Sequence, residues 1–273
     1  MGPGSLETLG SSTTIGYKKL LRLPKTSTSK IRIVIEKSRD KAFISNLGLF
    51  NAPEILSDPE ILRNKSGWVT IKTETPDPEI RYTLDGSDPT PSSPKYTGPF
   101  LLKEGGVVKA RTFINDFKEQ SEVVTKKFYL NQSKWKVTDF SDQHKSYPAD
   151  NAIDGNEATM WHTHWGEKVI KHPHHITVDM GEIVEIEGFY YIPRKDDNKS
   201  GTIAKYSFGI STNGTKWKTI IPNGEFANIA NNPIPQEVRF NQTYSARFFK
   251  FTSHEGAFDE DWVSVAEIGI INK

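Results

Sequence analysis

The sequence of 273 residues contains no cysteine. This excludes disulfides, thiolate catalysis and cysteine-ligated zinc, but it does not fix the compartment, because exported bacterial proteins often lack disulfides as well. Long hydrophobic runs are also missing, and no stretch approaches the ~20 apolar residues that span a bilayer. The net charge is only +1 and no run of like charge stands out. We therefore expect no nucleic-acid partner and no membrane span.

Aromatic residues, by contrast, reach 11% of the chain. Short runs that alternate or are rich in β-branched and aromatic residues are separated by Asp-Gly and Asn-Gly turn signals. The predicted strands are Lys30–Glu36, Trp68–Glu74, Glu79–Leu84, Val107–Ile114, His175–Met180, Glu187–Pro193, Lys205–Ser211 and Arg247–Ser253. No amphipathic pattern longer than two helical turns was found. The predicted class is all-β.

Two polar joints divide the sequence. Asn51–Glu60 carries two prolines between strand patterns, and Leu130–Val137 follows the end of another strand. We therefore predict three parts: residues 1–53 as the last strands of a preceding domain, 54–131 as a spacer domain and 132–273 as a complete domain. The opening MGPGS is typical of an expression-tag remnant, so any export signal is expected upstream of it.

The chain also contains an internal repeat. Ser29–Phe50 resembles Ser245–Ile271, since each has a strand, a polar loop and a closing strand, with Gly48 and Gly269 in register. The loop of the second copy is five residues longer. This repeat predicts that the chain ends with a complete domain and begins with the tail of a related one.

Six fragments of the last part point to a family. In order they are AIDGNEATMWHTHW, PHHITVDMG, IEGFYYIPRKDD, YSFGISTNGTKW, ARFFKF and SVAEIGI. Together they resemble the discoidin, or coagulation factor 5/8 type C, domain, and within it the family 32 carbohydrate-binding modules. The resemblance implies an eight-stranded, galactose-binding-like jelly-roll sandwich.

The Asp-Gly-Asn turn at residues 154–156 favours a calcium site. Asp154 and Thr159 place oxygen ligands close together, and hard oxygen donors suit Ca²⁺. The family resemblance adds carbonyls of this loop and a glutamate before the last strand. The full predicted set for structural calcium is Asn151, Asp154, Asn156, Thr159, Ala266 and Glu267. The alternative is a hydrogen-bonded turn that holds no ion.

Histidines are concentrated around the same region, which raises the possibility of zinc. His162 and His164 lie two residues apart, and His172, His174 and His175 surround a proline. Catalytic zinc requires three or four converging ligands. Since the family resemblance accounts for much of this histidine pattern without a metal, zinc is the less favoured interpretation.

Galactose-binding members of the family use a histidine, a Pro-Arg motif, nearby amides or acids and an aromatic residue in the last loop. The resemblance therefore implies a sugar site made of His162, His164, Glu187, Arg194, Asn198, Phe258 and Trp262. The planar fork of Arg194 can donate to two hydroxyls at once. Alternatively, Arg194 forms a structural salt bridge with Asp196, and Trp262 packs in the core. Lys199 stands where some members carry an amide.

The two leading parts resemble other modules. Residues 54–129 resemble the small fibronectin-type-III-like domain of chitobiases and β-hexosaminidases, an immunoglobulin-like sandwich; its Asp-Gly-Ser-Asp-Pro-Thr motif lacks the spacing of an EF-hand loop. Thr13–Pro53 resembles the end of a family 29 α-L-fucosidase. The chain has no room for the barrel of roughly 250 residues on which such an enzyme acts. We therefore expect no catalytic activity in this chain.

Taken together, these patterns predict the non-catalytic tail of an exported bacterial glycoside hydrolase, extracellular, periplasmic or at the cell surface. Its expected partners are an upstream catalytic domain and glycans that end in galactose or N-acetylgalactosamine. Two alternatives remain: a structural or adhesive module that contacts proteins or the cell surface, and an independent hydrolase that uses the histidines. The fold alone does not choose among them.

Overall fold

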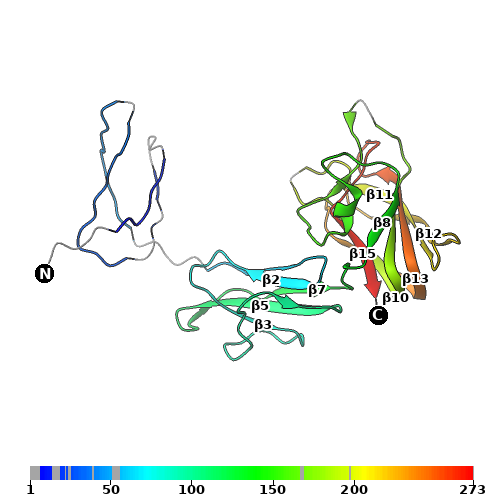
Figure 1. Ribbon diagram of the computed structural model, residues 1–273, viewed down its shortest axis with the longest axis horizontal. Helices are drawn as coiled ribbons and strands as arrows, with labels where there is room; N and C mark the ends of the chain where they lie inside the picture. The colour runs from blue at the N-terminus through cyan, green and yellow to red at the C-terminus, as the bar shows by residue number, and fades with distance from the viewer. Residues whose placement is uncertain are drawn as a thin grey trace. The chain divides into compact units, whose positions relative to one another are not determined.

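The computed structural model describes residues 7–13, 19–21, 23, 26–38, 40–50, 56–166, 169–196 and 198–272. The chain forms two compact units, Met1–Ala52 and Pro53–Lys273 (Figure 1). The regular structure of the described residues consists of β-strands and a single 3-10 turn, so the predicted all-β class is confirmed. No helix among them is long and apolar enough to cross a membrane. The predicted boundary at residues 53 and 54 lies outside the described residues.

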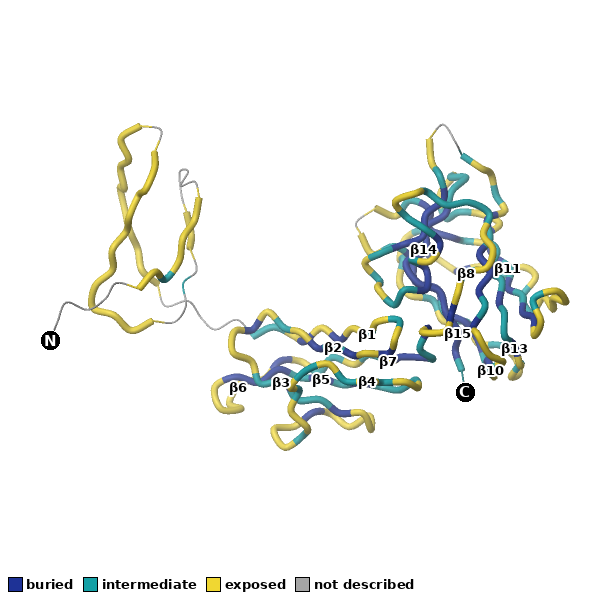
Figure 2. The backbone as a smooth tube through the Cα atoms, in the orientation of Figure 1, coloured by how far each residue is buried: buried dark blue, intermediate teal, exposed yellow. Residues whose placement is uncertain are grey.

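The leading unit contains no hydrogen-bonded strand among its described residues, so the predicted strand Lys30–Glu36 is not formed. Its alternating isoleucines are exposed, as Figure 2 shows for nearly the whole unit. An alternating pattern makes a strand only when a neighbour pairs with its backbone and covers one face. The described part of residues 7–50 supplies no such neighbour. The TTIGYK motif of the fucosidase resemblance lies, apart from Thr13, outside the described residues.

The middle domain is a sandwich of two small antiparallel sheets. Its strands are β1 (Glu60–Arg63), β2 (Trp68–Lys72), β3 (Glu79–Thr83), β4 (Phe100–Leu101), β5 (Gly106–Ile114), β6 (Glu119–Gln120) and β7 (Val124–Phe128). One sheet has the order β1-β2-β4, and in the other β3, β6 and β7 all pair with β5. Alternate residues such as Val69, Ile71, Val108 and Ala110 point inward and form one apolar core between the sheets.

The last domain has eight strands in the described residues, as the jelly-roll prediction required. They are β8 (Lys136–Phe140), β9 (Trp161–His162), β10 (His174–Ile192), β11 (Ile203–Ser211), β12 (Lys218–Glu225), β13 (Gln236–Gly256), β14 (Ser264–Val265) and β15 (Glu267–Asn272), with the 3-10 turn η1 at Ala149–Ile153. The main sheet has the order β12-β11-β13-β10-β15, and β8 also pairs with β10. A short second sheet joins β9 and β14.

The core of the last domain is aromatic. Phe189, Phe208, Phe249 and Phe251 are fully buried, and the Phe189 and Phe208 rings stack at 4.4 Å. β10 is one long strand where the sequence predicted two, because its irregular middle interrupts the alternating pattern without ending the strand. Its pairing with β13 shifts register between Asp179 and Val184, where Gly181 has a φ of +84°. The loops at the ends of these strands carry most of the candidate site residues.

Candidate functional site

The short β9–β14 pair brings distant parts of the last domain together. His162 lies opposite Ser264, and the Thr163 N–H donates to the Val263 carbonyl at 3.1 Å. In the other direction, the Val263 N–H donates to the Thr163 hydroxyl at 3.0 Å. The segment that follows β9 is therefore fixed beside the segment that precedes β14. This contact holds His162 close to Trp262 in the fold.

The loop after β10 joins the same place through Ser200. The Trp262 indole N–H donates to the Ser200 hydroxyl at 2.7 Å, and the Ser264 hydroxyl donates to the Ser200 carbonyl at 3.0 Å. Trp262 is only partly buried and is not part of the main core cluster. The alternative of pure core packing therefore does not describe it. Asn198 forms a turn by accepting the Ser200 N–H at 2.9 Å.

Arg194 is engaged inside this loop. Its Nε and Nη2 donate to the two carboxylate oxygens of Asp196, each at 2.6 Å, and Nη1 donates to the Ser200 carbonyl at 3.3 Å. The side chain is 11% exposed, whereas that of Asp196 is 47% exposed. The structural salt bridge that the sequence left as an alternative is thus present. It directs Asp196, more than Arg194, toward solvent.

Trp165 is an exposed aromatic side chain of the site that was not among the residues predicted from the sequence. It is 44% exposed. Its ring lies 4.4 Å from the His144 ring, 4.8 Å from the His162 ring and 5.9 Å from the Tyr147 ring. The HTHW motif was a visible signal, but the partners His144 and Tyr147 lie in a segment that no motif had marked. The cluster supports one exposed aromatic face.

The two predicted histidines differ in environment. His162 is buried and its Nδ1 lies 2.6 Å from the Thr163 carbonyl; burial lowers the pKa of His162 below its ordinary value. His164 is partly exposed and pairs through Nδ1 with Asp142 at 2.8 Å, which directs Nε2 away from Asp142. Burial opposes ionisation of Asp142, but hydrogen bonds from His164 outweigh it and lower the pKa of Asp142. His164 is therefore the better placed of the two to meet a ligand.

Glu187 does not join the site, which corrects its place in the predicted set. It lies five residues before the end of β10, or roughly 16 Å along an extended strand. Its carboxylate forms an ion pair with Arg239 of β13 at 3.0 Å.

Phe258 is exposed in the loop after β13, and its carbonyl accepts the Glu260 N–H at 2.7 Å. This loop is tied to the one after β10, since Glu260 accepts the Gly201 N–H at 2.6 Å.

The remaining histidines are held by separate partners. His174 bonds through Nε2 to the Asp261 carbonyl at 2.7 Å, and His175 bonds to Asp139 at 2.9 Å. Among the described residues, no three His, Asp, Glu or Cys side chains form a group that could hold a metal ion. The geometry gives no support to a zinc centre.

The predicted calcium residues do meet, between η1 and β15. Glu267 is buried, and its Oε1 accepts the N–H groups of Gly155 at 2.7 Å and Asn156 at 3.0 Å. Asp154 accepts the Thr159 hydroxyl at 2.7 Å. Burial, together with the adjacent Asp154 carboxylate, raises the pKa of Glu267 well above its ordinary value. The remaining members, Asn151 and Ala266, lie in the segments that carry these acids, and the Asn151 amide donates to the Met160 carbonyl at 3.0 Å.

Gly155 also fixes this loop against the middle domain. Its φ is +78°, and a Cβ atom there would lie 2.7 Å from the Lys65 nitrogen and 2.8 Å from the Asn64 carbonyl carbon. Nearby, Lys126 of β7 forms an ion pair with Glu157 at 2.7 Å. The loop that carries Asp154 thus contacts residues of the middle domain as well as Glu267 of the last domain.

Comparison with known families agrees with two of the three resemblances. Residues 136–268 match the F5/8 type C domain family, and residues 69–128 match the family described as Fn3 associated. The last domain is therefore similar to the F5/8 type C family and the middle domain to the Fn3-associated family.

Individual proteins match over the last domain. A galactose oxidase from Gibberella zeae is 32% identical over 143 residues, which cover 52% of this chain and 20% of that protein. A sialidase from Micromonospora viridifaciens is 28% identical over 145 residues, covering 52% of this chain and 22% of that protein. The chain thus spans about a fifth of the length of these relatives. A Clostridium perfringens module named CBM32-5, solved with GalNAc-β-1,3-galactose, shares 30% identity and covers 51% of this chain and 96% of that chain, with a TM-score of 0.46.

Proposed function

We propose that the last domain is a carbohydrate-binding module that holds a terminal galactose-type sugar, galactose or N-acetylgalactosamine, at the loop end built around Trp165. The exposed face of Trp165, braced by His144 and His162, is the observation that carries the proposal. A sugar with an axial hydroxyl has one apolar C–H face and one polar edge. An aromatic face beside fixed polar groups suits both.

The polar edge of the sugar has several partners in the same place. His164 presents Nε2, and Asp196 presents a carboxylate that Arg194 holds in position. Asn198 and Phe258 line the neighbouring loops, and Trp262 anchors them through Ser200. We expect millimolar affinity for a single sugar unit, about −4 kcal/mol per site.

The two curated relatives support this proposal, since both are named for sugar substrates and are 32% and 28% identical to this part of the chain. We further propose that the chain acts as the non-catalytic tail of an exported bacterial glycoside hydrolase, an α-L-fucosidase by the resemblance of residues 13–53. In that protein the last domain would hold the glycan on which the catalytic domain acts.

Calcium is part of the proposal as a structural ion. The buried Glu267 carboxylate lies close to the half-buried Asp154 carboxylate, and a cation would offset their repulsion. Thr159 and the carbonyls of Asn151, Asn156 and Ala266 would complete an oxygen set. The residues fit the ion, which would supply positive charge that holds the η1 loop against β15.

A glycan array with the full chain tests the sugar proposal. We expect retention by galactose-terminated and N-acetylgalactosamine-terminated glycans, and loss of retention in Trp165→Ala. Trp68→Ala is the matched control, because Trp68 is 46% exposed but lies on β2 of the middle domain. If no glycan is retained while the chain binds cell surfaces, the adhesive alternative replaces this proposal.

A further inference from the structure

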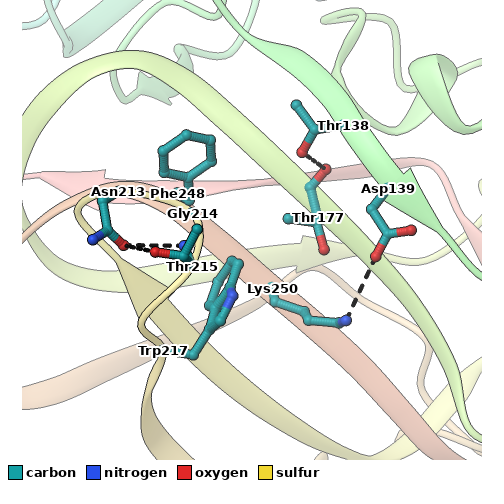
Figure 3. A pocket seen from close by; sticks show the side chains of 9 residues that line it. All are labelled: Thr138, Asp139, Thr177, Asn213, Gly214, Thr215, Trp217, Phe248 and Lys250. Carbon is teal, nitrogen blue, oxygen red and sulfur yellow. Dashed lines mark hydrogen bonds and ion pairs between the residues drawn. The ribbon is translucent and has the colours of Figure 1, made fainter.

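A hollow lies on the solvent face of the main sheet, apart from the loop site. It has a volume of about 370 Å³ and is lined by Thr138, Asp139, Thr177, Asn213, Gly214, Thr215, Trp217, Phe248 and Lys250 (Figure 3). Small-molecule sites occupy about 300 to 1,000 Å³, so the hollow is of suitable size. None of its residues belongs to the loop site or to the calcium set.

Three lining residues, Asp139, Thr177 and Lys250, belong to one row of residues across paired strands, which continues to Gly209. Asp139 of β8 pairs with Thr177 of β10, Thr177 with Lys250 of β13, and Lys250 with Gly209 of β11. Since residues directly opposite each other share a face of a sheet, the polar members of this row point to the same side. Their neighbours along the strands, such as Ile176 and Phe249, are buried in the core.

Trp217 forms the apolar wall. It is 40% exposed, and its ring lies over the bare backbone of Gly209, where an added Cβ would meet the ring at 3.9 Å. Phe248 adds a second aromatic surface, and the Gly214 backbone packs on its ring. The turn at residues 211–216 is held by Asn213, whose Oδ1 accepts the N–H groups of Thr215 at 3.0 Å and Lys216 at 2.9 Å. The wall is thus fixed before any ligand arrives.

Opposite this wall stand polar groups with capacity for a ligand. The Thr177 hydroxyl is buried and, among the described residues, has no hydrogen-bond partner. Asp139 is 2.9 Å from the His175 ring nitrogen and 3.6 Å from the Lys250 ammonium, and its side chain remains more than half exposed. A buried hydroxyl without a partner is unfavourable, so a group that bonds to it gains from binding there.

We propose that this sheet-face hollow is a second sugar site, in which a pyranose ring packs its C–H face on Trp217 and its hydroxyls meet Asp139, Thr177 and Lys250. The choice of a sugar rests on the proposed function of the domain. A free anion would face the Asp139 carboxylate, and a wholly apolar ligand would leave the Thr177 hydroxyl unpaired. The hydroxyl groups of a sugar suit both Asp139 and Thr177, because a hydroxyl can donate a hydrogen bond to the Asp139 carboxylate and can also bond to the Thr177 hydroxyl.

Calorimetric titration of the full chain with galactose, N-acetylgalactosamine and a galactan oligosaccharide tests the proposal. The matched variants are Trp165→Ala and Trp217→Ala, which remove similarly exposed indoles from the two sites. We expect two sites in the wild type, one in each variant and none in the double variant. In the Trp165→Ala background, Thr177→Val should weaken the remaining site about tenfold, or about 1.4 kcal/mol, without lowering the melting temperature.

The outcomes separate the two sites. If Trp165→Ala abolishes all binding, the sheet-face site is wrong and the loop site stands. If Trp217→Ala abolishes binding while Trp165→Ala does not, sugar binding at the sheet face is supported and sugar binding at the loop end is contradicted. A wild type that binds none of the three probes overturns both. A Thr177→Val change that leaves the remaining affinity unaltered also overturns the assigned role of that hydroxyl.

Discussion

The two copies of the internal repeat have similar sequence patterns, but the apolar side chains are exposed in the first copy and largely buried in the second. Ile33 of the first copy is 46% exposed, whereas Phe249, at the matching position of the second, is 0% exposed. The second copy has neighbours: β13 pairs with both β10 and β11, and its apolar side chains enter one core. The described residues of the first unit provide none. The comparison shows that an alternating pattern identifies which side chains can be buried. The segment forms a strand only where neighbouring strands pair with it and a core covers its apolar face.

Hydrogen exchange should show the largest difference between the copies. Amides of Lys30–Glu36 should exchange close to their intrinsic rates, while those of Arg247–Phe251 need unfolding of the last domain. A stability of about 5 kcal/mol corresponds to several thousandfold protection. Mass spectrometry of peptides from the dilute chain gives both rates at once. Equal protection in the two copies would show that the first is paired and covered, and would remove the contrast.

Matched truncations should sharpen the contrast next. Phe249→Ala removes a ring that lies 5.7 Å from both the Trp135 and Phe208 rings, so we expect a loss of about 3 to 5 kcal/mol. Ile33→Ala should change unfolding by no more than about 0.5 kcal/mol, as for a surface substitution. Chemical denaturation measures both. A large effect at Ile33 would mean that the first copy contributes to a core.

Calcium should distinguish the copies by charge. Asn46 stands where the second copy has Glu267, and a neutral amide is a weaker ligand for a hard cation. We expect a chelator to lower the melting temperature of the last domain, because removing calcium from a thousandfold excess over its dissociation constant costs about 4 kcal/mol of unfolding free energy. Glu267→Gln should remove the response to calcium, whereas Asn46→Ala should keep it. If the melting temperature of the last domain is the same with and without the chelator, the turn holds no ion.

The pH response should be the smallest difference and should arise only from the second unit, because all seven histidines lie between His144 and His254. Burial lowers the pKa of His162, so the unfolded chain binds its proton at a higher pH than the folded one. This contribution to stability is complete above the unfolded pKa of about 6.5 and is lost as pH falls below it. His162→Asn should flatten the decline measured by thermal unfolding between neutral and mildly acidic pH; His254→Asn, on the exposed end of β13, should leave it unchanged.

Much of the fold was readable from strand patterns. The predicted Trp68–Glu74, Glu79–Leu84, Val107–Ile114 and Lys205–Ser211 coincide with β2, β3, β5 and β11 within a few residues. β12 and the first half of β13 were missed, because their residues are largely exposed and lack the apolar alternation on which the prediction depended. The strand at Lys30–Glu36 was wrong for the opposite reason: the pattern is present, but pairing is a property of the whole sheet.

The site was predictable where motifs encode local geometry. The Asp-Gly-Asn turn meets Glu267 as expected, since its spacing fixes the turn and the resemblance supplied the distant glutamate. The placement of Glu187 was wrong because a motif gives order along the chain and not distance from the strand end. Trp165 and Trp217 were missed as possible ligand contacts because exposure of a tryptophan depends on tertiary packing.

The sugar-binding claim is tested most directly by the indole N–H resonances of the six tryptophans, which report on separate parts of the molecule. In a galactose titration of the calcium-loaded full chain, we expect the Trp165 and Trp262 signals to shift together and saturate in the millimolar range. The signals of Trp68 in the middle domain and of the buried Trp135 and Trp161 should stay in place, while Trp217 reports on the sheet face separately. Saturation without movement of Trp165 and Trp262, or no movement of any signal, would contradict a sugar site at the loop end.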